Sequence, residues 1–115
     1  MFIPNAGACL ATTNVMSRKG LVRWMLRDPS QDPVDNGWRI MSHLDTAEYL
    51  ASKPWQIVDF NDVCMIEPAL IGIWDLAVGS DLQLVVDETG KHIVDTPTGR
   101  EIPLENMYVP PQFRA

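Results

Sequence analysis

The chain has few of the residues from which catalytic and metal sites are built. It contains two histidines and two cysteines in 115 residues. It has no Gly-rich phosphate loop, no nucleophile elbow, no HExxH and no CxxC. We expect Cys9 and Cys64 to be small buried apolar side chains. Their spacing relative to His43 and His92 matches no zinc pattern, so we expect no enzymatic activity, no metal and no cofactor.

Long apolar runs are also missing. No run approaches the roughly 18–20 residues that a membrane span needs. The N-terminal segment has no basic residue ahead of its apolar part, which makes it a poor signal peptide. These two absences predict a cytoplasmic protein that does not enter a membrane. The hydrophobic content of 46%, with four tryptophans, is typical of a packed globular chain, and the length predicts one domain.

Basic residues are scarce. The chain has nine lysines and arginines and fifteen acidic residues, which gives a net charge of −6. Residues 1–27 carry a charge of +4 and residues 28–115 carry −10. An acidic surface repels phosphate, which argues against nucleic acid as a partner. It favours a basic protein surface as the partner, or serves only to keep the protein soluble.

Two β-prone segments open the chain. Residues 8–15 are apolar, and a polar turn at residues 17–20 follows them. Residues 21–27 then alternate, which predicts a strand whose core face carries Val22, Trp24 and Leu26. Its other face would carry Arg23 and Arg27, beside Met25. We expect the two segments to form a hairpin.

An acidic loop comes next, with the sequence DPSQDPVDNG over residues 28–37. Two prolines stiffen it, and Asn36-Gly37 supplies a turn that tolerates positive φ. It carries Asp28, Asp32 and Asp35 and no base. These properties suit a recognition loop for a basic partner, and they equally suit a solvated connector. The strand pattern resumes over residues 38–41, with Trp38 and Ile40 inward.

The second half of the chain alternates short helices and strands. Asp45 as a cap and Glu48 three residues later have the spacing of a capping box, flanked by Leu44 and Tyr49 as a hydrophobic staple. This helix must end before Pro54. A strand is expected over residues 55–60 and a helical turn over residues 63–66.

The next segments are a helix that begins at Pro68, or a buried strand over residues 69–76. A hairpin is expected from residues 81–86 and 92–94. Together these patterns predict an α+β fold, a single small domain with a mostly antiparallel sheet and two short helices. We place this domain at residues 1–95 and a Pro-rich extended tail at residues 96–115.

Two further groups of residues are candidates for a chemical role. Asp59 and Asp62 could bind a cation or do acid–base work, although a helix cap from Asp62 beside a solvated Asp59 is favoured. For Arg39, a structural ion pair is favoured over a contact with substrate. A small-ligand or regulatory module around Asp59, Asp62 and His43 is the alternative function, and it would require a pocket there.

The order of these segments resembles a known family. The chain reads GLVRWMLRD, then DNGWRIMSHLDTAEYL, then WQIVDFNDVCMIEPALIGIWDLAVGSDLQLV, and the Gly37-Trp38-Arg39 core matches a GWR strand. In the order of these segments, the chain is similar to the bacterial polymorphic-toxin immunity protein 33 family, formerly a domain of unknown function. It departs from the family in the segment after GWR, which is less acidic here, and the tail from about residue 87 has no counterpart.

The resemblance implies a protein that is encoded beside a bacterial toxin, binds it and blocks it. We expect the toxin to present a basic surface. The residues expected to bind it are the acids Asp28, Asp32, Asp35, Asp45, Glu48, Asp59 and Asp62. Those expected to build the fold or the family motif are Trp24, Gly37, Trp38, Arg39, Ile40 and Tyr49.

Overall fold

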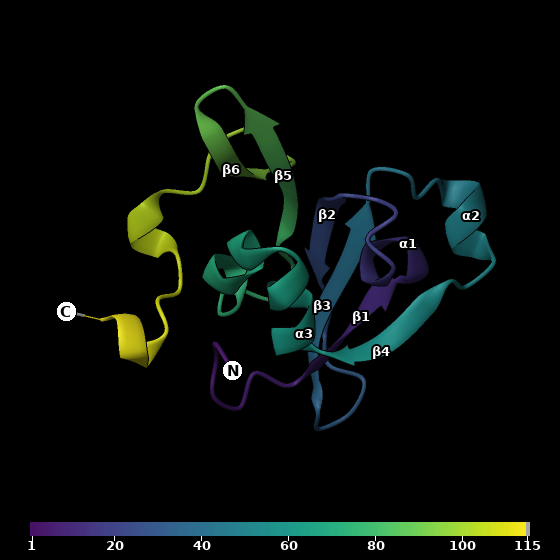
Figure 1. Cartoon of the computed structure of the whole chain (residues 1–115), viewed down its shortest axis with the longest axis horizontal. Coiled ribbons are helices and arrows are strands. Elements are labelled where there is room, and N and C mark those ends of the chain that lie inside the picture. Colours follow the sequence, from purple (N-terminus) through teal and green to yellow (C-terminus); the bar gives the residue numbers. More distant parts are fainter. Residues whose placement is uncertain (115) are drawn as a thin grey trace.

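The computed structural model describes residues 1–114, and its central element is one six-stranded sheet (Figure 1). The strand order across the sheet is β4-β1-β3-β2-β5-β6. The strands are β1 (Ala8–Thr12), β2 (Val22–Arg27), β3 (Asp35–Ser42), β4 (Trp55–Asp59), β5 (Asp81–Asp87) and β6 (Gly90–Asp95). The expected hairpin near the C-terminal end is confirmed as β5 and β6, which pair in an antiparallel register.

The sheet is mostly antiparallel, as the sequence predicted. Strands β1 and β3 are parallel, and the other four pairings are antiparallel. The α+β class is therefore confirmed. The expected hairpin between β1 and β2 is wrong, because β3 lies between these two strands and pairs with both.

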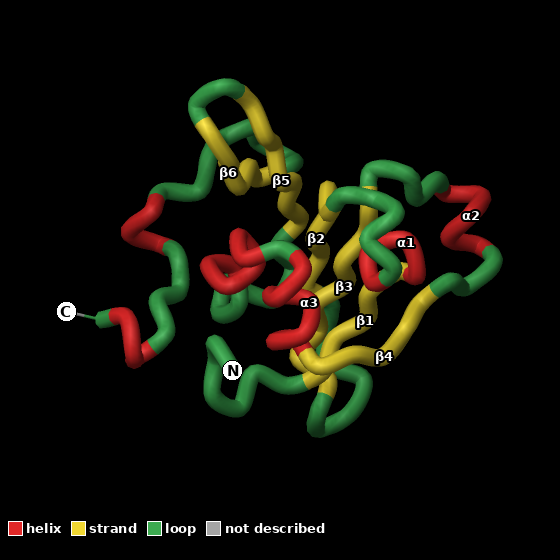
Figure 2. Tube along the Cα trace, viewed as in Figure 1, coloured by secondary structure: helices red, strands yellow, loops and turns green. Residues whose placement is uncertain are grey.

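The helices are short (Figure 2). The α-helices are α1 (Thr13–Met16), α2 (Ala47–Ala51) and α3 (Phe60–Ile66), and the 3-10 helices are η1 (Pro68–Ile73), η2 (Leu104–Asn106) and η3 (Pro111–Phe113). The segment after Pro68 is thus a helix and not the alternative buried strand. None of the helices within residues 1–114 is long and apolar enough to cross a membrane.

The capping residues expected for two helices are wrong, by one residue for α2 and by three residues for α3. Thr46, not Asp45, caps α2, because its Oγ1 accepts a hydrogen bond from the Tyr49 amide. Asp59, not Asp62, caps α3, because its carboxylate accepts from the Asn61 amide at 2.8 Å. Asp62 instead lies in the first turn of α3, where a negative charge still favours the helix dipole.

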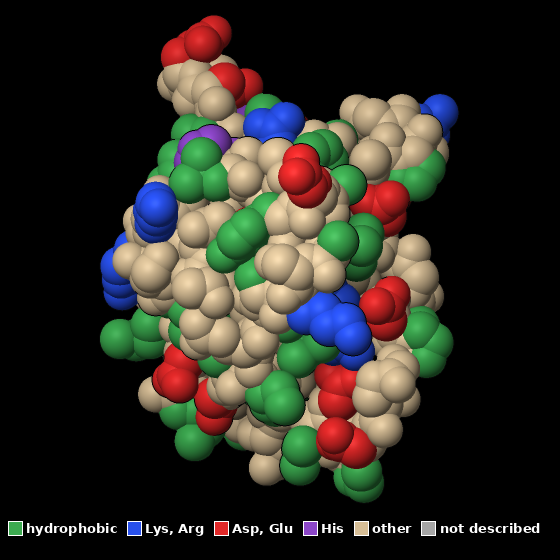
Figure 3. Space-filling view, turned by 90° about the vertical axis from the view of Figure 1, so that its right-hand side faces the viewer, with side chains coloured by type: hydrophobic (Ala, Val, Ile, Leu, Met, Phe, Trp, Pro, Cys, Tyr) green, Lys and Arg blue, Asp and Glu red, His purple; other side chains and the backbone are tan. Residues whose placement is uncertain are grey.

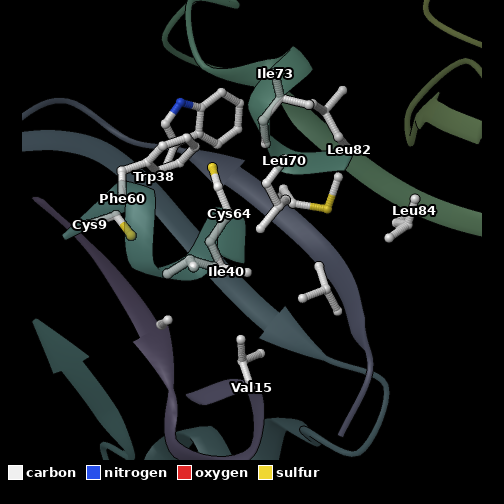
Figure 4. Close-up of a cluster of buried hydrophobic side chains, with 14 of the residues drawn as sticks. Cys9, Val15, Trp38, Ile40, Phe60, Cys64, Leu70, Ile73, Leu82 and Leu84 are labelled. Carbon is white, nitrogen blue, oxygen red and sulfur yellow. The ribbon is translucent and has the colours of Figure 1, made fainter. Parts of the chain in front are cut away.

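The hydrophobic core lies between the sheet and the α3–η1 layer. Figure 4 shows Phe60 and Cys64 of α3 and Leu70 and Ile73 of η1 lying over the strands, with Trp38 among them. All five side chains are fully buried. Trp38 and Ile40 point inward as predicted. The Trp38 indole Nε1 also donates a hydrogen bond to the Trp74 carbonyl at 3.0 Å.

The faces of β2 are the reverse of the prediction for its central residues. Met25 is fully buried in the core, while Trp24 and Leu26 are half-buried on the opposite face. The pairing of β2 with β3 shifts register between Val22 and Trp24, so an irregularity changes the face on which the later residues lie. Val22 remains buried, and Arg27 lies over the Trp38 ring on the core side.

The free cysteines Cys9 and Cys64 are both buried, as expected. Burial raises the pKa of each thiol to about 12. Both thiols are therefore held in the neutral form at physiological pH, and they contribute to the core as small apolar groups.

The segment from residue 96 follows the helix side of the molecule. The Ile102 amide donates to the Ile93 carbonyl and the Tyr108 amide donates to the Gly72 carbonyl, both at 2.8 Å. The Gln112 side chain donates to the Phe2 carbonyl at 2.9 Å. The division of the chain at residue 95 stays a prediction.

Candidate functional site

Within residues 1–114, no helix packs across the centre of one face of the sheet, and only Leu50 of α2 borders a hollow on it. Figure 1 shows α3 and η1 in front of the strands, while α2 lies beyond their ends. Directly paired residues of neighbouring strands lie on the same face. We therefore define the open face by its cross-strand pairs, Leu10 with Arg39 and Ile57, Leu26 with Arg39 and Asp81, Trp24 with Met41, and Thr12 with Trp55.

An ion pair lies at the centre of the open face. Both terminal nitrogens of Arg39 donate to the two carboxylate oxygens of Asp35 at 2.9 Å, a bidentate geometry that fixes both groups. The Asp28 carboxylate lies 3.5 Å from Arg39 Nε. The Arg39 side chain is 8% exposed and that of Asp35 is 12% exposed. The expected structural ion pair of Arg39 is therefore present, and its partner belongs to the acidic loop.

Four hydrogen bonds hold the Asp35 carboxylate in its charged form. Besides the two from Arg39, it accepts from the amides of Gln31 and Gly37 at 2.8 Å each. The Arg39 side chain is the main cause, and these amides add to it, so that the pKa of Asp35 lies well below its ordinary value. Through these hydrogen bonds, Asp35 fixes the acidic loop to the sheet.

Gly37 is required by a close approach between backbone segments. Its φ is +90°, and a Cβ atom built there would lie 2.1 Å from the Asp28 carbonyl oxygen. The Asp28 amide donates to the Gly37 carbonyl at 2.8 Å. Only glycine combines this φ with this lack of space. The GWR motif therefore has three separate roles, with Gly37 at a backbone crossing, Trp38 in the core and Arg39 on the open face.

The acidic loop is folded on itself. Asp32 Oδ1 accepts from the amides of Val34 and Asp35 at 3.0 and 3.2 Å, an Asx-type turn. Asp28 and Asp32 are both exposed. The structure thus brings together all three expected loop acids at one end of the open face. Asp28 and Asp32 are exposed to solvent, and Asp35 is largely buried against Arg39.

Two hollows lie on the open face. The hollow next to the acidic loop has a volume of about 240 Å³ and is lined by Leu10, Ile57, Val34, Arg39 and the loop. The hollow next to α2 has a volume of about 390 Å³ and is lined by residues that include Leu26, Met41, Leu50 and Trp55. Leu10 and Arg39 line both hollows, so they form the ridge between them.

The other expected partner-binding acids lie in two places. Asp59 and Asp35 are both paired with Ala8, from opposite sides of β1, so Asp59 lies near the acidic loop, and Asp62 follows it in α3. Glu48 lies in α2 and is exposed, at the other end of the strands. The structure therefore gathers five of the seven acids toward one end of the sheet.

Asp45 has a structural role near α2. It accepts hydrogen bonds from Thr12 Oγ1 at 2.6 Å, from Asn14 Nδ2 at 2.9 Å and from the Ser42 amide at 2.6 Å. Burial alone would raise the pKa of Asp45, but these hydrogen bonds outweigh it and hold the pKa below its ordinary value. Asp45 ties β1 and β3 to the segment that precedes α2.

The residues of the alternative ligand site do not meet. Asp59 lies at the end of the sheet where Asp35 begins β3, whereas His43 follows Ser42 at the other end of that strand. His43 accepts a hydrogen bond from the Leu21 amide at 3.0 Å. In the described part of the chain, no group of three His, Cys, Asp or Glu side chains has the arrangement of a metal site.

On the edge of the molecule nearest α2, the acidic side chains do not form one continuous patch. Figure 3 draws the edge of the molecule on the α2 side, and its acids lie in separate places among hydrophobic and neutral groups. Net charge alone therefore does not locate a binding surface. The distinguishing feature of the open face is that acids border apolar side chains.

Sequence reasoning missed the apolar residues of this face. Leu10, Trp55 and Ile57 were placed in strands with no role assigned, although Ile57 is 80% exposed. Side chains two residues apart in a strand lie on the same face, so Trp55 and Ile57 share a face. This alternation was the signal that could have identified them. Asp35, Gly37 and Arg39 show the same period, which predicts that the carboxylate and the guanidinium lie on one face.

A comparison with protein families gives one match. The model of the Immunity protein Imm33 domain matches residues 9–95. This range includes nearly all of the sheet, the acidic loop and α1 to α3. It also extends to residue 95, so the expectation of no counterpart from about residue 87 is wrong for residues 87–95. No curated protein and no solved structure gives a significant match.

Proposed function

Because the chain belongs to the Imm33 immunity protein family, we propose that it binds a cognate bacterial toxin and neutralises it by covering its active or substrate-binding surface. It would act as a stoichiometric inhibitor without catalysis, in the cytoplasm of the cell that makes the toxin. The observation that carries this proposal is the family match over residues 9–95. Neither nucleic acid nor a membrane is needed as a partner.

The acidic loop supports a toxin with a basic surface. Asp28 and Asp32 project from a loop whose shape is fixed by the Asp32 turn and by the bonds of Asp35. A loop that is ordered before binding loses less entropy on association. Exposed acids on such a loop also speed the encounter with a basic partner. Glu48, Asp59 and Asp62 are further contacts in this proposal.

Neutralising the two exposed loop acids tests this role. In the double variant Asp28→Asn and Asp32→Asn, each amide oxygen still accepts hydrogen bonds, so the turn is retained while two charges are lost. We expect the association rate constant for the toxin domain encoded beside the gene to fall about tenfold at low salt, and the difference to shrink as salt is added. Stopped-flow or surface binding kinetics over a series of ionic strengths measures this effect.

A matched control loses two charges elsewhere. Asp75 and Glu105 are exposed and lie after η1 and in η2, so the variant Asp75→Asn with Glu105→Gln should associate as fast as the unaltered protein. Equal rates for the two double variants would remove the acidic loop from the interface. Failure of the unaltered protein to bind the toxin, or to protect cells that express it, would instead contradict the proposed function itself.

A further inference from the structure

The solvent side of the sheet is unusually apolar. In an antiparallel sheet with one solvent-exposed face, the strands normally alternate apolar residues that point inward with polar residues that point outward. Here the outward positions Leu10, Leu26, Met41, Trp55 and Ile57 are also apolar. Ile57 is 80% exposed in the middle of edge strand β4. Contiguous apolar side chains of this kind, bordered by polar groups, are typical of protein–protein interfaces.

The open face is also shaped and rigid at its centre. The two hollows meet at the ridge of Leu10 and Arg39, and the Arg39 guanidinium is held by its bidentate bond to Asp35. The loop-side hollow has Ile57 and Val34 at its walls, and Val34 is 63% exposed. A partner side chain can therefore enter a preformed hollow without rearrangement of the sheet.

The charges around this surface determine the chemistry of its occupant. Asp32 lines the loop-side hollow and Asp28 lines the hollow next to α2. Asp59 ends β4, and Asp81 is paired with Leu26 on the same face. The central base, Arg39, is already neutralised by Asp35. A second base, Arg23, lies over the Trp24 ring and donates to Gln83, and it does not line the loop-side hollow. An apolar centre with an acidic rim complements a basic protein surface with an apolar side chain at its centre.

Two other occupants fit the surface less well. The chain's own C-terminal segment up to residue 114 packs on the helix side, through Tyr108 on Gly72 and Gln112 on Phe2. A second copy of the chain, related by a two-fold axis, would bring the same acids together across the interface, and like charges there oppose association.

From these observations we infer that the open face is the docking surface for the toxin, with Ile57 and the loop-side hollow at its centre and the acids Asp28, Asp32, Asp59 and Asp81 at its rim. The inference rests on the proposed function and adds the site and the chemistry of the partner. A basic toxin surface inserts an apolar side chain beside Ile57, and its lysines or arginines meet the rim.

Substitutions of Ile57 test the inference, because its exposed side chain is not needed for the core. The probe is the toxin domain encoded beside the gene, titrated by calorimetry. Ile57→Lys should weaken binding at least about 30-fold, since it places a charge of the partner's sign at the interface centre. Ile57→Glu should weaken binding less, because its charge is opposite to that of the partner.

The matched control is Leu104→Lys, since Leu104 is 85% exposed in η2 on the helix side. It should bind within about threefold of the unaltered protein. Wild-type affinity for Ile57→Lys would overturn the inference while leaving the proposed function intact. A dimer of the unaltered protein in light scattering that Ile57→Lys converts to a monomer would also overturn it, because the occupant would then be a second copy.

Discussion

Replacement of Trp38 by alanine is expected to lower the free energy of unfolding by about 4 kcal/mol, the cost of removing a large aromatic side chain from a packed core. The Trp38 side chain is fully buried. The substitution leaves a cavity beneath α3 and η1, and it leaves the Trp74 carbonyl without the indole donor. A small domain has a total stability of about 5–15 kcal/mol, so the loss is a large part of it.

Two companion variants identify the cause of this loss. Trp38→Phe keeps an aromatic ring but removes the indole donor, and it should cost about 2 kcal/mol. Trp24→Ala changes the half-buried tryptophan of the open face and should cost about 1 kcal/mol. Urea denaturation followed by far-UV circular dichroism measures all three. Equal losses at Trp38 and Trp24 would contradict the assignment of the two side chains to opposite faces.

Replacement of Asp35 by asparagine has the second large expected effect, a loss of about 3 kcal/mol at neutral pH. The guanidinium of Arg39 stays at a largely buried position with only the exposed Asp28 carboxylate left near it, 3.5 Å from Nε. A buried charge that loses its bidentate partner is strongly destabilising. The double variant Asp35→Asn with Arg39→Met should lose less than the sum of the two single losses, because removal of both charges relieves the unpaired group. Asp75→Asn, an exposed acid, should change stability by less than about 0.5 kcal/mol.

The same pair predicts a pH dependence. The Arg39 side chain, with the Gln31 and Gly37 amides, lowers the pKa of Asp35 below its value of about 3.9 in an unfolded chain. A carboxyl whose pKa is lower in the folded state stabilises that state fully above the unfolded value and progressively less as the pH falls below it. The stability difference between the unaltered protein and Asp35→Asn should therefore be constant from pH 5 to 7 and shrink below about pH 4. A difference that does not change with pH would show that the ion pair is not its source.

Local sequence patterns predicted local structure well. The turns and the alternation around Trp38 and Ile40 identified β3. For the segment after Pro68 the sequence left a helix and a buried strand open, and the structure has the helix. Patterns of this kind report which face of a segment is apolar, but not which segments become neighbours. The insertion of β3 between β1 and β2 joins residues that are distant in sequence, so no turn signal marks it.

The errors at the open face share a physical cause beside the register shift in β2. The prediction for β2 assumed that the strand has one apolar face and one polar face. In the structure Met25 is buried on one face, and Trp24 and Leu26 make the other face apolar as well. A sheet that is apolar on both faces does not show its core side by alternation. The same ambiguity hid the proposed docking surface, because an outward Ile57 looks like a core residue until the neighbouring strands are known.

Hydrogen exchange of the full chain, alone and in complex with the toxin domain encoded beside the gene, tests the central claim most directly. Edge strand β4 has one side without a partner strand, and the acidic loop is exposed, so amides of both exchange readily in the free protein. Binding to the open face predicts slowed exchange at residues 55–59 and 28–34, with residues 104–113 unchanged. Slowed exchange confined to η1 and residues 104–113, with β4 and the loop unaffected, would place the toxin on the helix side and contradict the account.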